Sequence, residues 1–333
     1  MPTTTRRATS ADVARHAGVS RTTVSYVVNG IANAGISAET RDRVLAAAAA
    51  LGYSQYGPGR ALKSGRSEVV LFVLNDAPIL HAMNSFLDEL DARLTAGGMS
   101  LLLYRVSPRG NPLSRIWREV GPFAVIGIDS ISSQDAASMR KAGIDVIRLS
   151  LGGGDGSDAI TRTEAEVGEA QVRFLAGRGH REIGYAYPDE ARVITFATRR
   201  LEGARRACRE LGLPDLDVRT VPLARAEAAE ALLPWTGESR VTAVCAFNDL
   251  VAFAVLAGLR DNGVRVPEDV AVIGVDNDPV GELVSPSLTT IDTYRADTAA
   301  RLAARIGAAR ASEPEPTDST LATYAVVVRE SAP

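Results

Sequence analysis

The stretch SADVARHAGVSRTTVSYVVNG, residues 10–30, decides how the front of this chain folds. Thr9 can serve as the N-cap of a short helix that opens the stretch. Gly18 suits a turn with an unusual backbone conformation. Ser20 can cap a second helix, which runs to about Asn29. Two short helices joined by a glycine-containing turn form a helix-turn-helix, and the stretch predicts this arrangement.

The predicted second helix has an apolar face and a polar face. At about 100° per residue, Val24, Val27 and Val28 share one face. The opposite face carries groups that can read base edges in the major groove of DNA, namely Arg21, Thr22, Ser25, Tyr26 and Asn29. A purely structural helical hairpin would show the same two faces. The pattern by itself therefore leaves both interpretations open.

A third helix and an excess of positive charge follow. The segment ISAETRDRVLAAAAALGYS has a capping residue at Ser37, helix formers from Thr40 to Leu51, and a stop at Gly52. Residues 1–66 contain nine basic and three acidic residues, whereas the whole chain carries a formal charge of −3. A basic front on an acidic remainder favours contact with a polyanion.

Length and composition limit the class of protein. The 333 residues suffice for two or three domains, and 46% hydrophobic and 23% charged residues are ordinary for a globular protein. No apolar run is long enough to cross a membrane, and MPTTTRRATS lacks the apolar core of a signal peptide, so we expect a cytoplasmic protein without membrane contact. Cys208 and Cys245 are too few for a disulfide framework and are expected to be small buried hydrophobes.

Behind residue 66 the sequence alternates between strands and helices. Strands are expected at EVVLFVLN, MSLLLYRV, FAVIGID, DVIRLSL, EIGYAYP, VTAVCAFND and DVAVIGVDN, with helices that include residues 86–96 and 199–211. This alternation predicts two successive doubly wound parallel sheets, and hence two lobes with a cleft between them. Ligands of such sheets bind at the carboxyl ends of the strands.

Two other classes of protein can be weighed against a DNA-binding regulator. An enzyme is disfavoured because the sequence has no Walker-type phosphate-binding loop. Its three histidines, His16, His81 and His180, are also scattered, and no metal-ligand spacing or Ser-His-Asp pattern is apparent. We therefore expect no catalytic residue, no metal and no cofactor. A stand-alone solute-binding protein would need an export signal and would not carry a basic DNA-binding head. The sequence fits neither of these expectations.

The sequence resembles the lactose-repressor (LacI/GalR) family of bacterial transcription regulators. In its front part the resemblance rests on Asp12-Val13-Ala14, Ala17-Gly18-Val19-Ser20, Thr23-Val24-Ser25, Val28-Asn29-Gly30, Ser37, Thr40-Arg41, Val44 and Leu51-Gly52-Tyr53. Further on, GHREIGY, RRLEGARRACRELGL, VTAVCAFNDLVAFAVLAGLRDNGVRVPEDVAVIGVDN, SPSLTTI and VRES match in order. The first lobe matches less well: NDAPILHAM replaces an Asn-Pro-aromatic segment, and Thr163-Glu164 stands where an Asp-Asn pair is usual.

The resemblance implies an α/β protein with a helix-turn-helix head, a hinge, and a two-lobed body similar to periplasmic sugar-binding proteins. The expected parts are the head (1–55), the hinge (56–66) and the body (67–330), whose first lobe takes 67–159 with 291–320 and whose second lobe takes 160–290 with 321–330. It further implies a homodimeric repressor controlled by a small molecule, usually a sugar or sugar derivative. Whether that molecule releases or strengthens operator binding stays open.

The resemblance also assigns DNA contacts to the head and the hinge. Leu62 stands where a leucine from each of two subunits wedges into the minor groove, and Arg60 and Lys63 can contact phosphate. Gly57-Pro58-Gly59 replaces the usual alanine-rich start of the hinge helix, at a cost in helix propensity. The residues expected on palindromic operator DNA are Thr9, Ser20, Arg21, Thr22, Thr23, Ser25, Tyr26, Asn29, Arg60, Leu62 and Lys63.

Three residues of the second lobe fall on effector-binding positions of the family. Arg200 precedes Gly203 by three residues, Asn248 lies in FND, and Asp276 lies in GVD. A guanidinium, an amide and a carboxylate that converge in a cleft can hold a small hydroxylated or polar molecule. Each of these side chains could instead have a purely structural role, in a helix pair or a loop.

Overall fold

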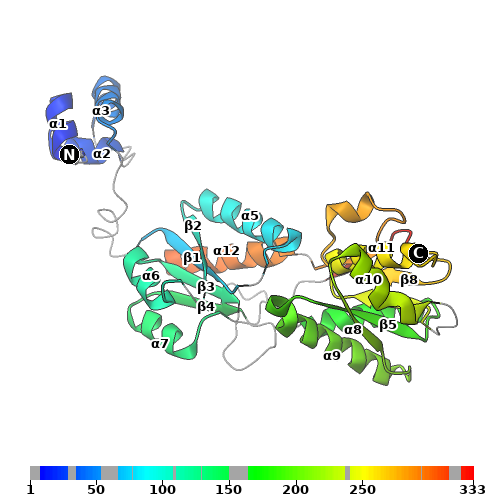
Figure 1. The fold of residues 1–333 in the computed structure, drawn as a ribbon. Helices are drawn as coiled ribbons and strands as arrows, with labels where there is room; N and C mark the ends of the chain where they lie inside the picture. The colour runs from blue at the N-terminus through cyan, green and yellow to red at the C-terminus, as the bar shows by residue number, and fades with distance from the viewer. Residues whose placement is uncertain are drawn as a thin grey trace, which may run out of the picture. The chain divides into compact units, whose positions relative to one another are not determined.

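Figure 1 shows the chain as a computed structural model with two compact units, Met1–Ser67 and Glu68–Pro333. The structure describes residues 8–28, 35–53, 67–76, 78–107, 110–128, 130–149, 164–236, 241–293, 295–314 and 324–333. Asn29 and the predicted hinge residues Arg60, Leu62 and Lys63 lie outside these described residues. We call the first unit the head and the second unit the body.

The head consists of α1 (Ser10–Ala17), α2 (Arg21–Val28) and α3 (Ala38–Ala50) in its described part. Thr9 forms a capping box with Asp12, because its hydroxyl accepts a hydrogen bond from the Asp12 amide while the Asp12 carboxylate accepts one from the Thr9 amide. Gly18 ends α1 in the left-handed conformation, with φ of 65°. The predicted cap and turn are confirmed.

Small aliphatic side chains from all three helices form the core of the head, namely Val13, Ala14, Ala17, Val24, Val27, Val44, Ala47 and Ala48. A hydrogen bond also links α3 to the end of α1, since Arg43 Nε donates to the Ala17 carbonyl over 2.9 Å. The predicted apolar face of α2 is confirmed: Val24 and Val27 are buried and Val28 is half-buried. The core fixes which face of α2 remains in solvent.

The body contains two four-stranded parallel sheets, which confirms the predicted doubly wound fold. The first has the order β2-β1-β3-β4, with β1 (Val69–Leu74), β2 (Ser100–Arg105), β3 (Ala124–Ile128) and β4 (Asp145–Leu149). The second has the order β6-β5-β7-β8, with β5 (Ile183–Pro188), β6 (Asp217–Val221), β7 (Ala243–Ala246) and β8 (Ala271–Ile273). A two-stranded antiparallel pair adds β9 (Thr290–Asp292) and β10 (Ala325–Val327).

Helices cover both faces of each sheet (Figure 1). Those on the first sheet are α5 (His81–Ala96), α6 (Leu113–Val120), α7 (Ser133–Lys141) and α12 (Arg295–Ala311). Those on the second are α8 (Glu164–Gly177), α9 (Ile194–Glu210), α10 (Arg225–Leu232) and α11 (Asp249–Asp261). Short 3₁₀ turns complete the body at Ala191–Val193, Leu233–Trp235 and Pro279–Glu282 (η3).

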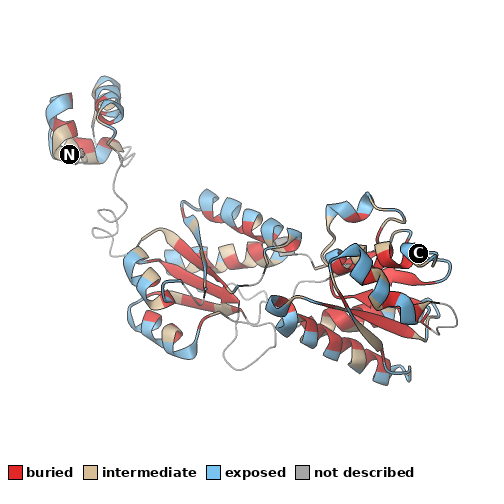
Figure 2. Cartoon of the chain, viewed as in Figure 1, coloured by how far each residue is buried: buried red, intermediate tan, exposed pale blue. Residues whose placement is uncertain are grey.

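The alternation of side chains along β1 shows how one strand serves two cores. Val70 and Phe72 point to the layer of α5 and α12, whereas Leu71 and Val73 point to the layer of α6 and α7. All four side chains are fully buried, as are most strand residues between the helical layers in Figure 2. A strand buried on both faces reads as a continuous apolar run, which is why EVVLFVLN could be recognised.

The chain crosses between the lobes near its C-terminal end. The Gly274 and Asp276 amides donate to the Thr289 and Ile291 carbonyls, which places β9 beside the end of the second sheet. The next helix, α12, packs against α5 on the first sheet. Each lobe of the body is thus assembled from separate stretches of the sequence.

Candidate effector site and DNA-contacting face

The exposed face of α2 carries the polar residues that the sequence predicts there. Arg21 and Thr22 are exposed, Tyr26 is 38% exposed, and Ser25 is half-buried. These side chains stand on the solvent side of a helix whose other side is fixed by the valine core. The arrangement suits a recognition helix, which presents its outward residues to base edges.

Three of the predicted DNA contacts also hold helix ends. The Thr9 hydroxyl donates to the Asp12 carboxylate over 2.7 Å. The Ser20 hydroxyl accepts from the Thr23 amide over 3.0 Å and lies 2.9 Å from the Thr23 hydroxyl. An N-cap hydroxyl stabilises a helix when its oxygen accepts a hydrogen bond from a backbone amide of the first turn. The same residues therefore define the start of each helix, whatever they contact on DNA.

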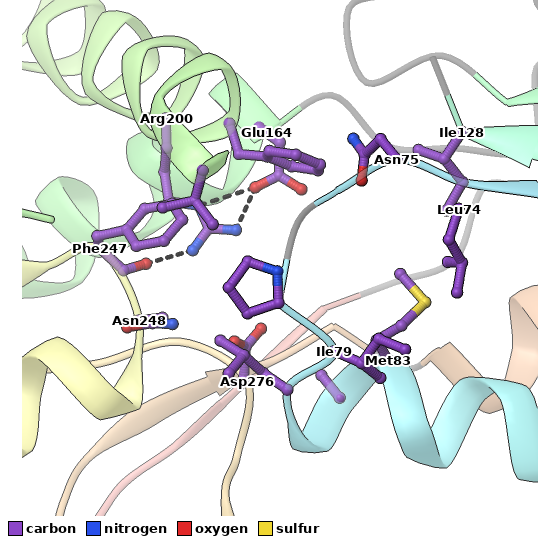
Figure 3. A pocket seen from close by; sticks show the side chains of 15 residues that line it. Leu74, Asn75, Ile79, Met83, Ile128, Glu164, Arg200, Phe247, Asn248 and Asp276 are labelled. Atoms are coloured by element: carbon purple, nitrogen blue, oxygen red, sulfur yellow. Dashed lines mark hydrogen bonds and ion pairs between the residues drawn. The ribbon is translucent and has the colours of Figure 1, made fainter. Parts of the chain in front are cut away.

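A pocket lies at the carboxyl ends of the central strands of the body, where the fold predicts ligand binding. Leu74 ends β1, Ile128 ends β3, and Phe247 directly follows β7. Figure 3 shows the three predicted effector residues around this one pocket. Its lining residues are Leu74, Asn75, Pro78, Ile79, Leu80, Ala82, Met83, Ile128, Glu164, Val193, Phe196, Arg200, Phe247, Asn248 and Asp276.

Arg200 is held by protein groups on three of its nitrogens. Its Nε donates to Glu164 Oε2 over 2.8 Å, its Nη2 donates to the same carboxylate, and its Nη1 donates to the Phe247 carbonyl. Arg200 is only 3% exposed and Glu164 only 6%. Burial acts to lower the pKa of Arg200, but the Glu164 and Asp276 carboxylates outweigh it and raise that pKa, so the guanidinium stays charged.

Close approach of two helix backbones brings this ion pair together. A Cβ added to Gly168 of α8 would overlap the Arg200 carbonyl, and one added to Gly203 of α9 would overlap the Ala165 carbonyl. Only glycine lets the helices pack at this distance. The first turn of α8 and the middle of α9 therefore meet, and Glu164 lies against the guanidinium of Arg200.

Asn248 caps a helix with one end of its side chain and leaves the other end at the pocket. Its Oδ1 accepts a hydrogen bond from the Val251 amide over 3.0 Å, so it is the N-cap of α11. Asn248 is 4% exposed and its side chain lies at the pocket (Figure 3). No described residue accepts a hydrogen bond from its Nδ2. This amide group is available as a donor to a ligand.

Asp276 is presented by a loop with an unusual backbone. Its φ is 109° and that of Asn277 is 49°, conformations that cost non-glycine residues on the order of 1–3 kcal/mol. The neighbouring Asp249 carboxylate holds this loop, accepting from the Asp278 amide over 2.7 Å and from the Thr290 hydroxyl over 2.6 Å. Asp249 thus links the start of α11, the Asp276 loop and β9.

Asp249 should make stability depend on pH. Burial raises the pKa of its carboxyl to about 7, since desolvation outweighs the two hydrogen bonds and the nearby Asp276 and Asp278 charges add to the rise. In the unfolded chain this group ionises near pH 4. Between these values the folded state holds the extra proton, so stability falls as pH rises from about 4 to about 7, by on the order of 4 kcal/mol.

We expect Asp249→Asn to remove this dependence. In urea denaturation series between pH 4.5 and 8, the variant should gain stability relative to the wild type as pH rises. The control is Asp261→Asn on the same helix: Asp261 is paired with Arg225, which lowers its pKa. The contribution of that pair is lost only below about pH 4, so over pH 4.5–8 Asp261→Asn should leave the slope of the wild-type stability curve unchanged. Parallel curves for the wild type and Asp249→Asn would contradict the assignment.

Sequence reasoning missed Glu164 and the apolar half of the site. Glu164 stood out only as a departure from the usual Asp-Asn pair, although an acid at the first position of a helix is common on electrostatic grounds alone. Phe196 and Phe247 are lining aromatics, but the sequence gives no sign that their rings face a pocket. Glu164 could have been found from several homologous sequences, if an acidic residue occurred at its position whenever an arginine occurred at the position of Arg200.

No helix in the described part of the chain has the length and apolarity to span a membrane. The described residues also contain no group of three or more His, Cys, Asp or Glu side chains that could bind a metal ion. Cys208 and Cys245 are both buried, as expected, and both are free thiols.

Known relatives match along most of the chain. A transcriptional repressor, PurR, from Vibrio cholerae serotype O1 (strain M66-2) is 28% identical over 299 residues, covering 85% of this chain and 86% of that protein. The PurR repressor of Pasteurella multocida (strain Pm70) is 29% identical over 314 residues, covering 88% and 89%. Both relatives are regulators, in line with the expectation that this chain is not an enzyme.

Solved structures agree in fold. The lac repressor dimer bound to operator and the anti-inducer ONPF is similar with a TM-score of 0.76 at 22% identity, covering 98% of this chain and 99% of that one. A LacI-family regulator from Silicibacter pomeroyi gives 0.77 at 25% identity, with coverage of 98% and 99%. Residues 172–332 match the periplasmic binding protein-like domain, and residues 9–55 match the bacterial regulatory proteins of the lacI family. Residues 9–55 therefore belong to the LacI family of bacterial regulatory proteins, and the chain is similar to DNA-binding transcription regulators of that family along most of its length.

Proposed function

We propose that this protein is a repressor that binds a palindromic operator as a homodimer and changes its operator affinity when a small molecule occupies the pocket of the body. The convergence of Arg200, Asn248 and Asp276 on one pocket at the strand ends is the observation that carries the effector role. The relatives named as repressors support the direction of regulation. The family resemblance favours a sugar or sugar derivative as the small molecule.

Homodimer formation is supported by apolar residues that the single chain leaves in solvent. Val280 on η3 is 47% exposed, Leu283 directly after η3 is 83% exposed, and Leu250 is 42% exposed at the start of the neighbouring helix α11. The Asp278 amide bonds to Asp249, so these apolar side chains belong to adjoining segments. Apolar residues that gather on a surface favour protein–protein contact.

Selection of operator DNA from random duplexes, followed by binding measurements across a salt series, tests the proposed DNA binding. The basic head should give an affinity that falls steeply with salt, because bound phosphates release their counterions. Enriched sequences should be two-fold symmetric if a dimer binds. Weak binding with no enriched sequence would contradict a role as operator-binding regulator.

Tyr26→Ala should change which half-site is preferred. Tyr26 is an exposed residue on the outward face of α2, and a residue that reads base edges affects some sequences more than others. A matched selection with Arg15→Ala, an exposed cation on α1, should lower affinity evenly across sequences, as loss of a general electrostatic contribution does. If Tyr26→Ala also weakens every sequence equally, Tyr26 does not read bases.

Asp276→Asn should weaken the response to the effector and leave operator binding without effector nearly unchanged. The substitution keeps the shape of the side chain and deletes its charge, and loss of a charged hydrogen-bond acceptor costs about 1–3 kcal/mol of binding free energy. Operator affinity is measured for wild type and variant across a titration with the identified effector. A normal response would remove Asp276 from the site, whereas a defect without effector would mark it as structural.

A further inference from the structure

The two lobes contribute different chemistry to the pocket. Among the described first-lobe residues that line it, Asn75 alone is polar, and the others are Leu74, Pro78, Ile79, Leu80, Ala82, Met83 and Ile128. The polar groups of Glu164, Arg200, Asn248 and Asp276 come from the second lobe. In Figure 3, Leu74 and Ile128 of the first lobe lie across the cavity from Arg200 and Asn248 of the second. A ligand that fills the pocket therefore meets a mostly apolar wall on the first-lobe side, and polar groups together with Val193, Phe196 and Phe247 on the second-lobe side.

Arg200, the cation among the described lining residues, is already paired. Two nitrogens of Arg200 donate to Glu164, a third donates to the Phe247 carbonyl, and the guanidinium carbon lies 4.7 Å from the centre of the Phe247 ring. Because both partners are buried, a ligand anion that took over the Arg200 nitrogens bonded to Glu164 would have to displace that carboxylate into an apolar environment. Isolated carboxylates are strongly disfavoured in such an environment.

Acidic groups outnumber basic ones among the lining residues that the structure describes. The charged residues among its described lining are Glu164, Asp276 and Arg200, two acids and one base. The polar side therefore offers a negative potential, together with the Asn248 amide as a neutral donor. Such a surface repels anions and accepts hydrogen bonds from hydroxyl or amino groups.

We propose that the effector is an uncharged or cationic molecule with an apolar body and a hydrogen-bond-donating end, and that Glu164 is the residue that excludes anionic ligands. The apolar body lies against the first-lobe wall that includes Ile79 and Met83, and the donating end faces Asp276. Phosphorylated or carboxylated compounds are rejected even where their uncharged counterparts bind. This assignment rests on the proposed effector role of the pocket.

Probe molecules that share a skeleton and differ in charge test the proposal directly. We would measure binding of the full chain by calorimetry and thermal shift to three matched sets: tyramine with 4-hydroxyphenylacetate, adenosine with adenosine 5′-monophosphate, and phenyl β-glucoside with phenyl β-glucoside 6-phosphate. Wherever at least one compound of a set binds, the uncharged or cationic compound should bind at least about tenfold more tightly than the anion. A tenfold difference in affinity corresponds to about 1.4 kcal/mol of binding free energy.

Glu164→Gln should reduce this discrimination at least about threefold, because it removes the charge that holds Arg200. Glu190→Gln is the matched control: Glu190 pairs with Arg192 on the surface and does not line the pocket, so discrimination should stay as in the wild type. If Glu164→Gln does not fold, the wild-type comparison decides by itself, and an anion that binds as tightly as its uncharged counterpart overturns the proposal.

The outcomes separate this inference from the proposed function. Preferred binding of an anion that is lost in Asp276→Ala would leave the effector site in place and overturn the assigned ligand class. Binding of every probe with equal affinity to wild type and Asp276→Ala would remove the pocket as the effector site, and the ligand class would fall with it. Both would also fall if a charge-balanced compound library yields no ligand whose binding Asp276→Ala affects.

Discussion

Glu164→Ala is expected to destabilise the body by about 3–5 kcal/mol, the cost of leaving a buried charge without its partner. The guanidinium of Arg200 is 3% exposed, and Glu164 supplies the acceptor for two of its nitrogens. In the variant these donors lose their bonds at a site that is almost fully buried. The free energy of unfolding from urea titrations of wild type and variant measures the effect.

The matched control for this change lies on the same helix. Glu169 pairs with Arg206, whose side chain is 45% exposed, so Glu169→Ala should cost less than about 1 kcal/mol. A double variant, Glu164→Met with Arg200→Met, should recover much of the loss because it removes both buried charges together. If Glu164→Ala proves no more harmful than Glu169→Ala, the buried pair does not have the role in stability that its geometry indicates.

The fold was largely predictable because its strongest signals are local. Strands buried on both faces appear as apolar runs such as EVVLFVLN, and the caps Thr9 and Ser37 occupy the residues that the sequence indicated. Strand β6 (Asp217–Val221) escaped detection for the opposite reason. It is an edge strand of sequence DVRTV with only Val221 buried, so it lacks an apolar run.

The helix ends were less predictable than the helices. The sequence indicated helices over 86–96 and 199–211, whereas α5 begins at His81 and α9 begins at Ile194. No side chain caps the start of either helix, so the usual sequence signal for a first turn is missing. Tertiary packing sets these boundaries, with Phe196 in the first turn of α9 packed against the cores of both lobes.

The pocket was predictable in position but only in part in chemistry. Arg200, Asn248 and Asp276 could be placed together because the carboxyl ends of parallel strands meet at one edge of a sheet. The state of Arg200 could not be foreseen, since it depends on how closely α8 approaches α9. That approach is set by Gly168 and Gly203, and a glycine within a helical pattern indicates a close contact without identifying its partner.

Gly168→Ala should therefore be among the most damaging single-methyl changes in the body, at about 3 kcal/mol of stability or more. The added Cβ would overlap the backbone carbonyl of Arg200, which cannot rotate away as a side chain could. To relieve the overlap, α8 must move from α9, which also pulls Glu164 from Arg200. The variant should therefore lose stability and effector binding together, as measured by urea denaturation and by titration with a bound probe.

Gly177→Ala supplies the comparison that isolates this cause. Gly177 is the last residue of the same helix, is exposed, and has no atom within 4 Å of an added Cβ. Since alanine is a better helix former than glycine by about 1 kcal/mol, Gly177→Ala should leave stability unchanged or raise it slightly. Equal effects of the two substitutions would mean that helix propensity, and not the contact between α8 and α9, governs both. A loss of stability in Gly168→Ala alone would instead show that the geometry of the Glu164–Arg200 pair depends on the absence of a side chain at position 168.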